Sequence, residues 1–437
     1  MQNEWAKKCL SFIDQSVSCY HAVETIEKML IEKGYLELCE KDDWKIRPGE
    51  KYFVKRNDSS IIAFALPKGE IKGFHIVASH SDSPSFKVKT KPEMKAGDIY
   101  VKLNVEPYGG MIYATWFDRC LSVAGRIVCD EAGELKSRTV NIDEDLLVIP
   151  NVAIHMNREM NKELSYNPQT DLLPLISVDV AEEDEKVEKK EKKVKDAVLL
   201  QKLAVWAGVQ TETILGSDLF LYVRERGKLA GAGKELMIAP RLDDLECVYA
   251  SAQALLDACP KEYVSVCAVF DNEEVGSLTR QGAASTFLKD TLERLSEALG
   301  KKGSEYLRLL ADSFLISADN AHALHPNHGE KADPVNKPML NGGIVIKHHG
   351  GQKYTTDGYT EAVMKSLCRE AEVPYQDYHN RSDIPGGSTL GNISGGQVSV
   401  PAVDIGLAQL AMHSAVETAG SKDIEYLIKA LKVFYQK

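Results

Sequence analysis

The chain has 437 residues, 44% of them hydrophobic and 27% charged, values typical of a soluble globular protein. Lys and Arg number 53 against 64 Asp and Glu, so the formal net charge is −11. This balance argues against general binding to nucleic acid or to anionic membranes, since both require a basic face. The length is sufficient for two or three domains with a large core.

Nine cysteines are scattered along the chain, and no two of them form a CxxC pair. An odd, unpatterned set fits reduced thiols in a cytosolic protein better than a disulfide framework. The first residues, MQNEWAKKCLSFIDQS, contain no apolar stretch of signal-peptide length, and no later segment reaches 18 apolar residues. We therefore expect a cytoplasmic protein.

The first part of the chain has the pattern of predicted helix and strands that is typical of an α/β domain. Apolar residues recur at helical spacing over 4–34, which predicts one amphipathic helix that ends at Gly34. Strands are predicted at 51–56 and 60–66. A third strand, FHIVAS at 74–79, is apolar without alternation, as expected for a strand buried on both faces.

A β-rich insertion is predicted at 86–233, where short apolar segments alternate with Lys, Asn and Gly. Within it, 182–196 (EEDEKVEKKEKKVKD) has seven acidic and six basic residues among fifteen. The simplest interpretation of this segment is a solvated loop or helix extension.

The alternation of strands and helices returns after the insertion. Strands are predicted at 236–239, 264–270, 314–318, 342–347 and 399–406, and helices at 245–258, 286–299, 304–311, 358–371 and 422–435. Such alternation favours a mostly parallel sheet flanked by helices. The predicted organisation is one α/β catalytic domain built from 1–85 and 234–437, interrupted by the β-rich domain at 86–233.

Several of the predicted strands lead into His, Asp or Glu. The residues in question are His80, Asp243, Glu273, Glu274, Asp319 and His413. Because the carboxyl ends of strands in an open α/β sheet line the ligand crevice, these side chains are predicted to share one pocket. Imidazole and carboxylate ligands without a thiolate are typical of a catalytic zinc site.

Each of these features also has a simpler interpretation when taken alone. A His-x-Asp sequence after a strand is commonly structural, Glu273-Glu274 is commonly a solvated helix start, and Asp243 before a helix is commonly an N-cap. Their recurrence at several strand ends favours the metal site. In such a site one glutamate of the pair can bind metal while its neighbour acts as general base.

Seven motifs together carry a more specific resemblance. In chain order they are HSDSP (80–84), RLDDL (241–245), DNEEVGS (271–277), SADNAHALHPNH (317–328), IKHHGGQKYTTD (346–357), RSDIPGGSTLG (381–391) and LAMHS (410–414). Together they resemble the M18 family of zinc aminopeptidases, the aspartyl aminopeptidase group, over nearly the whole chain. The resemblance implies the zinc-peptidase catalytic fold, with the insertion acting as a dimerisation domain.

The resemblance also implies roles for individual residues. Asp243 would bridge two zinc ions; His80 and Asp319 would complete the ligands of one ion, and Glu274 and His413 those of the other. Mn²⁺ or Co²⁺ could occupy the same N and O ligands.

Other matching residues would act around the metals. Glu273 would be the general base, Asp82 would orient His80, and His322 and Lys347 would contact the substrate. One departure is visible, because Asp244 stands where some relatives have Asn.

His155, in the insertion, matches a histidine that in the family enters the active site of a neighbouring subunit and stabilises the oxyanion. Two alternatives remain at this stage, a third histidine ligand beside His80 and His413, or a structural histidine. The resemblance further implies a homo-oligomer, a tetrahedral dodecamer built from dimers.

The sequence thus predicts a dizinc aminopeptidase acting on peptides with a free N-terminus. Lys347 favours acidic first residues, Asp or Glu, while a preference for neutral or hydrophobic residues is the alternative. A dizinc carboxypeptidase or deacylase is a further alternative, because such enzymes use the same kind of metal ligands and general base. A non-catalytic protein that retains the fold is the rival from another class, disfavoured because all five ligands and Glu273 are present.

Overall fold

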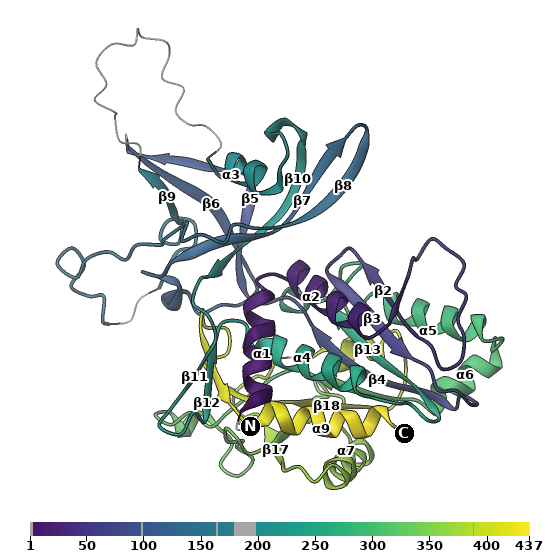
Figure 1. Ribbon diagram of the computed structural model, residues 1–437. Helices are drawn as coiled ribbons and strands as arrows, with labels where there is room; N and C mark the ends of the chain where they lie inside the picture. Colours follow the sequence, from purple (N-terminus) through teal and green to yellow (C-terminus); the bar gives the residue numbers. More distant parts are fainter. Residues whose placement is uncertain (1–2, 98, 163–164, 179–197, 388) are drawn as a thin grey trace. The chain divides into compact units, whose positions relative to one another are not determined.

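The computed structural model describes residues 3–97, 99–162, 165–178, 198–387 and 389–437, which form two compact units (Figure 1). The first unit comprises Met1–Ser83 and Arg226–Lys437, and the second comprises Pro84–Glu225. The sequence analysis placed the corresponding boundaries after residues 85 and 233. The charged segment 182–196 lies outside the described residues.

The first unit is built on a nine-stranded sheet. In spatial order its strands are β1 (Leu36–Leu38), β2 (Lys51–Arg56), β3 (Ser60–Ala65), β13 (Tyr263–Phe270), β4 (Gly73–His80), β14 (Phe314–Ala318), β18 (Ala402–Gly406), β16 (Ile344–His348) and β17 (Tyr375–His379). The central strands β13, β4, β14 and β18 are mutually parallel, whereas β2–β3, β3–β13 and β18–β16 are antiparallel pairs. The carboxyl ends of the four central strands therefore meet at one edge of the sheet.

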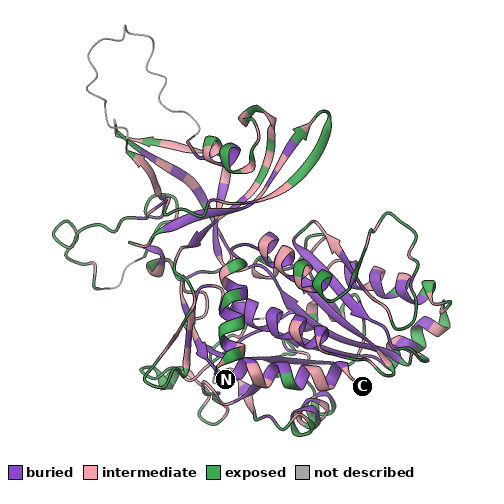
Figure 2. Cartoon of the chain, in the orientation of Figure 1, coloured by how far each residue is buried: buried purple, intermediate pink, exposed green. Residues whose placement is uncertain are grey.

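Helices cover both faces of this sheet. Along β3, Ile61 and Ala63 belong to one hydrophobic core and Ile62 and Phe64 to the other, because successive side chains of a strand point to opposite faces. The first core is closed by α1 (Glu4–Gln15), α2 (Cys19–Glu32), α4 (Leu242–Leu256), α7 (Gly358–Glu370) and α9 (Asp423–Tyr435). The second core is closed by α5 (Phe287–Ala298), α6 (Ser304–Ala311) and α8 (Leu390–Gly395). Figure 2 shows the resulting buried sheet.

The strands and helices predicted for this unit are confirmed apart from one helix. The single helix predicted over 4–34 is wrong, because the chain breaks between Gln15 and Cys19 into α1 and α2. Ser18 adopts an extended backbone at the start of α2, as an N-cap residue does. The two helices keep a common apolar spacing, which made the break invisible to periodicity.

A second, smaller sheet also belongs to the first unit. It has five strands in the order β11 (Lys228–Ala230), β12 (Leu236–Ala239), β20 (Glu417–Gly420), β19 (Ala408–Leu410) and β15 (Ala321–His322). The strand predicted at 236–239 is confirmed, but it lies in this smaller sheet and not in the mostly parallel one that the alternation favoured. β12 pairs antiparallel with β20, so the segments that lead to Asp243 and His413 come from this smaller sheet.

The second unit contains a six-stranded antiparallel sheet, which confirms the β-rich insertion predicted from its short apolar segments. Its strands, in spatial order, are β8 (Glu134–Asn141), β7 (Leu121–Glu131), β10 (Ile214–Val223), β5 (Ser85–Ala96), β6 (Tyr100–Tyr108) and β9 (Leu175–Val178). The helix α3 (Val198–Ala207) contacts β8.

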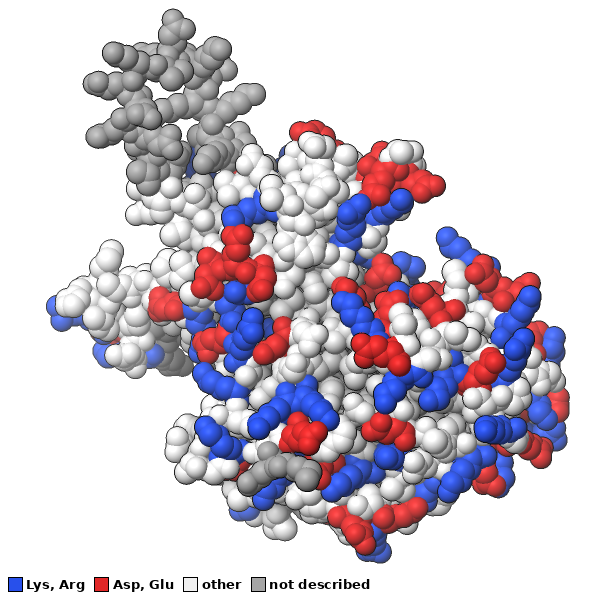
Figure 3. Space-filling model, in the orientation of Figure 1, with Lys and Arg blue, Asp and Glu red and all other residues white. Residues whose placement is uncertain are grey.

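Acidic and basic side chains are interspersed over the face seen in Figure 3. Among the described residues, no helix combines the length and the apolar character needed to cross a membrane.

Candidate metal centre

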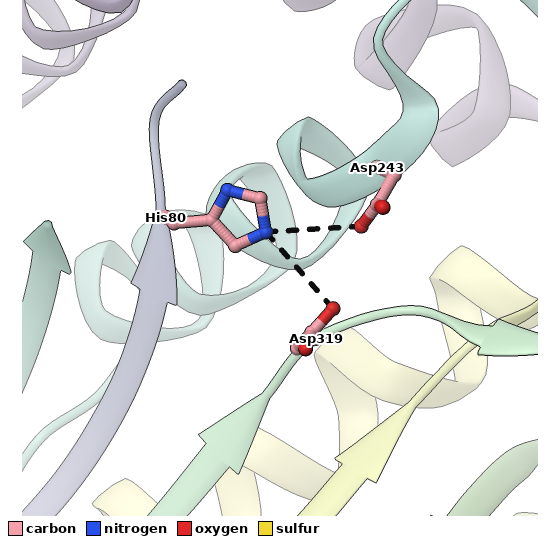
Figure 4. A group of neighbouring side chains, drawn as sticks. All are labelled: His80, Asp243 and Asp319. Atoms are coloured by element: carbon pink, nitrogen blue, oxygen red, sulfur yellow. Dashed lines mark ion pairs between the residues drawn. The ribbon is translucent and has the colours of Figure 1, made fainter. Parts of the chain in front are cut away.

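His80 and Asp319 lie at the carboxyl ends of neighbouring parallel strands. His80 is the last residue of β4, and Asp319 directly follows β14. Nε2 of His80 lies 4.0 Å from Oδ1 of Asp319 and 3.8 Å from Oδ1 of Asp243. Figure 4 shows this imidazole directed at both carboxylates. The three side chains are buried, and their ligand atoms lie within 4.8 Å of one another.

Asp243 also takes part in a second group. Its other oxygen, Oδ2, lies 3.3 Å from Nε2 of His413, and the same nitrogen lies 3.4 Å from Oε1 of Glu274. Asp243, Glu274 and His413 again bring their ligand atoms within 4.8 Å of one another. One carboxylate therefore faces two groups of metal-ligand type, with a different oxygen toward each.

The donor atoms of these groups fit divalent metal. Oδ1 of Asp243 and Oε1 of Glu274 are buried and accept no hydrogen bond from any described residue. Buried carboxylate oxygens without partners are costly unless a cation compensates them. Two imidazole nitrogens and carboxylates without a thiolate are the donor chemistry that zinc accepts at catalytic sites.

Asp82 organises the residues around the first group. Its carboxylate accepts hydrogen bonds from the backbone N–H of Glu273 at 3.1 Å and of Glu274 at 3.2 Å. Its backbone carbonyl lies 3.0 Å from Nδ1 of His80, closer than its carboxylate at 3.5 Å. Asp82 therefore fixes the far nitrogen of His80 and the turn that carries both glutamates.

The chain matches the family model described as aminopeptidase I zinc metalloprotease (M18) over residues 12–435. The chain belongs to the M18 aminopeptidase family. It is 45% identical over 436 residues to the probable M18 family aminopeptidase 2 of Clostridium acetobutylicum, with 99% of this chain and 98% of the relative covered. It is 39% identical over 452 residues to aspartyl aminopeptidase 1 of Schizosaccharomyces pombe, covering 99% and 95% of the two chains.

The structure of the mApe1 dodecamer of S. cerevisiae is also similar, with a TM-score of 0.85 at 28% identity over 99% of this chain and 96% of that one. The family resemblance drawn from the seven motifs is confirmed. The protein is an aminopeptidase, a hydrolase of the exopeptidase class, so the carboxypeptidase, deacylase and non-catalytic alternatives are set aside.

Burial and crowding set the protonation of the aminopeptidase's central carboxylates. Burial raises the pKa of Glu273 to about 8, and it also raises the pKa values of Glu274 and Asp319. Burial opposes the charged form of His413, but the negative charges of the neighbouring Asp243 and Glu274 carboxylates outweigh it and raise its pKa to about 11.

Lys347 and His322, the two predicted substrate-contacting residues, have different surroundings. Nζ of Lys347 is buried, 3.4 Å from Oδ2 of Asp319 and 3.1 Å from the backbone oxygen of Asn320. His322 lies on β15 and lines a cavity of about 490 Å³ together with Tyr378 and Gln409. Lys347 is not among the described residues that line this cavity.

His155 lies in the second unit, in a turn at residues 154–156 whose three side chains are exposed.

A further group, His348, Glu361 and Asp377, also has ligand-type spacing. Here Lys365 already supplies the positive charge, with Nζ 2.6 Å from Oε1 of Glu361 and 3.1 Å from Oδ1 of Asp377. This group is best explained as an ion-pair network.

Two residues that connect the segments of this centre, Asn320 and Glu417, were not predicted from the sequence. The side-chain amide of Asn320 donates to the backbone oxygen of Leu242 and to Oε1 of Gln409, each at 3.0 Å. The carboxylate of Glu417 accepts the backbone N–H of both Asp243 and His413. Asn320 directly follows a predicted site residue, which was a usable signal; Glu417 had none.

Zinc binding to the aminopeptidase is expected to tighten as the pH rises. The folded protein binds a proton on His413 more tightly than the unfolded chain, so this contribution to stability is present below about pH 6.5 and is lost toward about pH 11. A zinc ion bound by His413 would have to displace that proton. Its apparent affinity should therefore rise about 100-fold from pH 6 to pH 8 for each proton displaced.

Competition with a chelator of known zinc affinity at both pH values measures this effect. The variant His348→Gln, in the Lys365 network, should retain the full pH dependence. Equal zinc affinity at pH 6 and pH 8 in the unmodified protein would contradict the expectation.

Proposed function

We propose that this aminopeptidase is a cytoplasmic dizinc enzyme that removes acidic residues, Asp or Glu, from the N-terminus of peptides. The observation that carries the two-metal part is the position of Asp243. Its two carboxylate oxygens face separate groups, Oδ1 toward His80 and Oδ2 toward His413. A bridging carboxylate is the arrangement that holds two ions about 3.5–4 Å apart.

In this proposal Asp243 would contribute a ligand to both ions. His80 and Asp319 complete the protein ligands of one, and Glu274 and His413 those of the other, with Mn²⁺ or Co²⁺ as possible occupants of the same donors. The bound ions supply Lewis acidity toward the scissile carbonyl and lower the pKa of water.

Glu273 is the proposed general base. Its backbone is fixed by Asp82, its side chain is partly exposed beside the proposed ligands, and burial raises its pKa to about 8. Glu273 takes a proton from the attacking water and delivers it to the leaving amine. Asp82 holds the His80 ring through Nδ1 during this step.

His155 is proposed to complete the site from a neighbouring subunit, where its imidazole would donate to the developing oxyanion. Its exposure in a turn of the second unit supports contact with another subunit. Exposed apolar residues flank it, Val152, Ile154 and Met156, which is typical of an interface. The similar yeast structure is a dodecamer, and we propose the same assembly here, tetrahedral and built from dimers through the second unit.

The acidic preference is supported by charge. Among the described residues that line the cavity beside His322, none is Asp or Glu, whereas Lys331, Lys337 and Arg381 are basic. Lys347, the other substrate contact implied by the resemblance, is buried and paired with Asp319, so the basic residues of the cavity wall carry this argument. The S. pombe relative named an aspartyl aminopeptidase supports the same choice. His322, on the cavity wall, is the proposed contact for the substrate.

Specificity is tested with peptides that differ only in their first residue, each with a free and an acetylated amine. We expect release of Asp and Glu from free-amine peptides at least tenfold faster than release of Leu, and loss of release when a chelator is added. Faster release of Leu would contradict the acidic preference. Cleavage of acetylated peptides would contradict the aminopeptidase mechanism.

The role of His155 across subunits is tested by co-expressing two inactive variants, His155→Ala and Glu273→Gln. Each alone should lose at least 100-fold in kcat. Mixed assemblies should regain a readily measured part of the activity, because some active sites then combine Glu273 of one subunit with His155 of another. Absence of recovery in mixed assemblies would place His155 and Glu273 in the same subunit's site.

A further inference from the structure

The carboxylate of Glu417 joins two segments that are far apart in the sequence. Glu417 is the first residue of β20 and is 2% exposed. Its Oε2 accepts the backbone N–H of Asp243 at 3.0 Å, and its Oε1 accepts the backbone N–H of His413 at 2.7 Å. Each oxygen therefore serves one of the two chain segments that carry proposed metal ligands.

The backbone at both points needs such support. His413 has a φ of 66°, in the left-handed region that a residue with a Cβ adopts only when its surroundings impose it. Asp243 has φ −81° and ψ 112°, outside the helical range although it stands in the first turn of α4. At both of these points the carboxylate of Glu417 accepts the backbone N–H.

Glu417 is itself fixed by the smaller sheet. It pairs with Ala239 of β12, the strand that leads to Asp243. The neighbouring residue Thr418 pairs with Leu410 of β19, the strand that leads to His413. The carboxylate thus stands between the two strand ends from which both segments depart.

We propose that Glu417 is a positioning residue that sets the separation of the bridging carboxylate of Asp243 and the imidazole of His413, and so of the two zinc sites. This inference rests on the proposed two-zinc function. Glu417 holds main chain rather than metal, since both of its oxygens accept hydrogen bonds from backbone N–H groups. Outer partners of metal ligands of this kind affect metal affinity by 10- to 100-fold.

Glu417→Gln is the informative substitution. Glutamine keeps one acceptor oxygen but places an NH₂ donor opposite the second backbone N–H. One of the two segments therefore loses its hydrogen bond to this side chain. Asp423→Asn is a matched control. Asp423 is 1% exposed and also accepts two backbone N–H groups, from Asn341 at 2.7 Å and Gly343 at 2.9 Å, but it contacts none of the proposed ligands.

The measurements are zinc affinity by chelator competition, thermal stability, kcat and KM, all on the full-length assembly. Both variants should lose thermal stability. Glu417→Gln alone should weaken zinc binding at least tenfold and lower kcat at least tenfold, with KM changed less than threefold. If Glu417→Gln binds zinc like the unmodified protein and differs from it only in stability, as the control does, the proposal is overturned.

Glu417→Asp covers the case in which Glu417→Gln does not fold. Aspartate keeps both acceptors but is one methylene shorter, so zinc affinity should fall at least threefold; unchanged affinity would overturn the proposal. If the unmodified protein binds one zinc ion per chain, the two-zinc function fails. Weaker binding of that single ion in the variants would still support the positioning role.

Discussion

The need to compensate buried negative charge governs the centre of this aminopeptidase. Asp82, Asp243, Glu274 and Asp319 are buried at the ends of strands or the start of a helix, with His80 among them. Like charges at such distances cannot all ionise in a low-dielectric interior without cations. Both oxygens of Asp82 accept backbone hydrogen bonds, whereas Asp243 and Glu274 each keep one buried oxygen that accepts no hydrogen bond from a described residue. Bound zinc is the simplest compensation.

The residues of this centre come from both sheets of the first unit. The main sheet supplies His80, Asp319 and the glutamate turn, while the smaller sheet leads into Asp243 and His413. Asn320 joins them, because its amide donates to the start of α4 and to Gln409 on β19 while its Oδ1 accepts the N–H of Leu407. Gly406 allows the close approach, since a Cβ there would lie 2.0 Å from the carbonyl oxygen of Asp319. The packing of these strands therefore fixes the positions of the side chains in both groups.

Local patterns predicted the main strands well, because β4 and β13 are mostly apolar without alternation and lead directly into His, Asp or Glu residues. The break between α1 and α2 was missed because the apolar spacing continues across it. The smaller sheet was missed because its strands span only two to four residues and pair with partners distant in sequence. The clustering of His80, Asp243 and Asp319 was predictable from strand ends. The role of Glu417 was not, since a side chain that binds backbone N–H groups leaves no spacing signal.

Anomalous diffraction at the zinc edge, on crystals grown with zinc, tests the two-metal centre most directly. The account predicts two peaks per chain about 3.5–4 Å apart. The first would be bound by His80 and Asp319, the second by Glu274 and His413, and Asp243 would contribute one oxygen to each. A single peak, or a pair of peaks without Asp243 between them, would contradict the account.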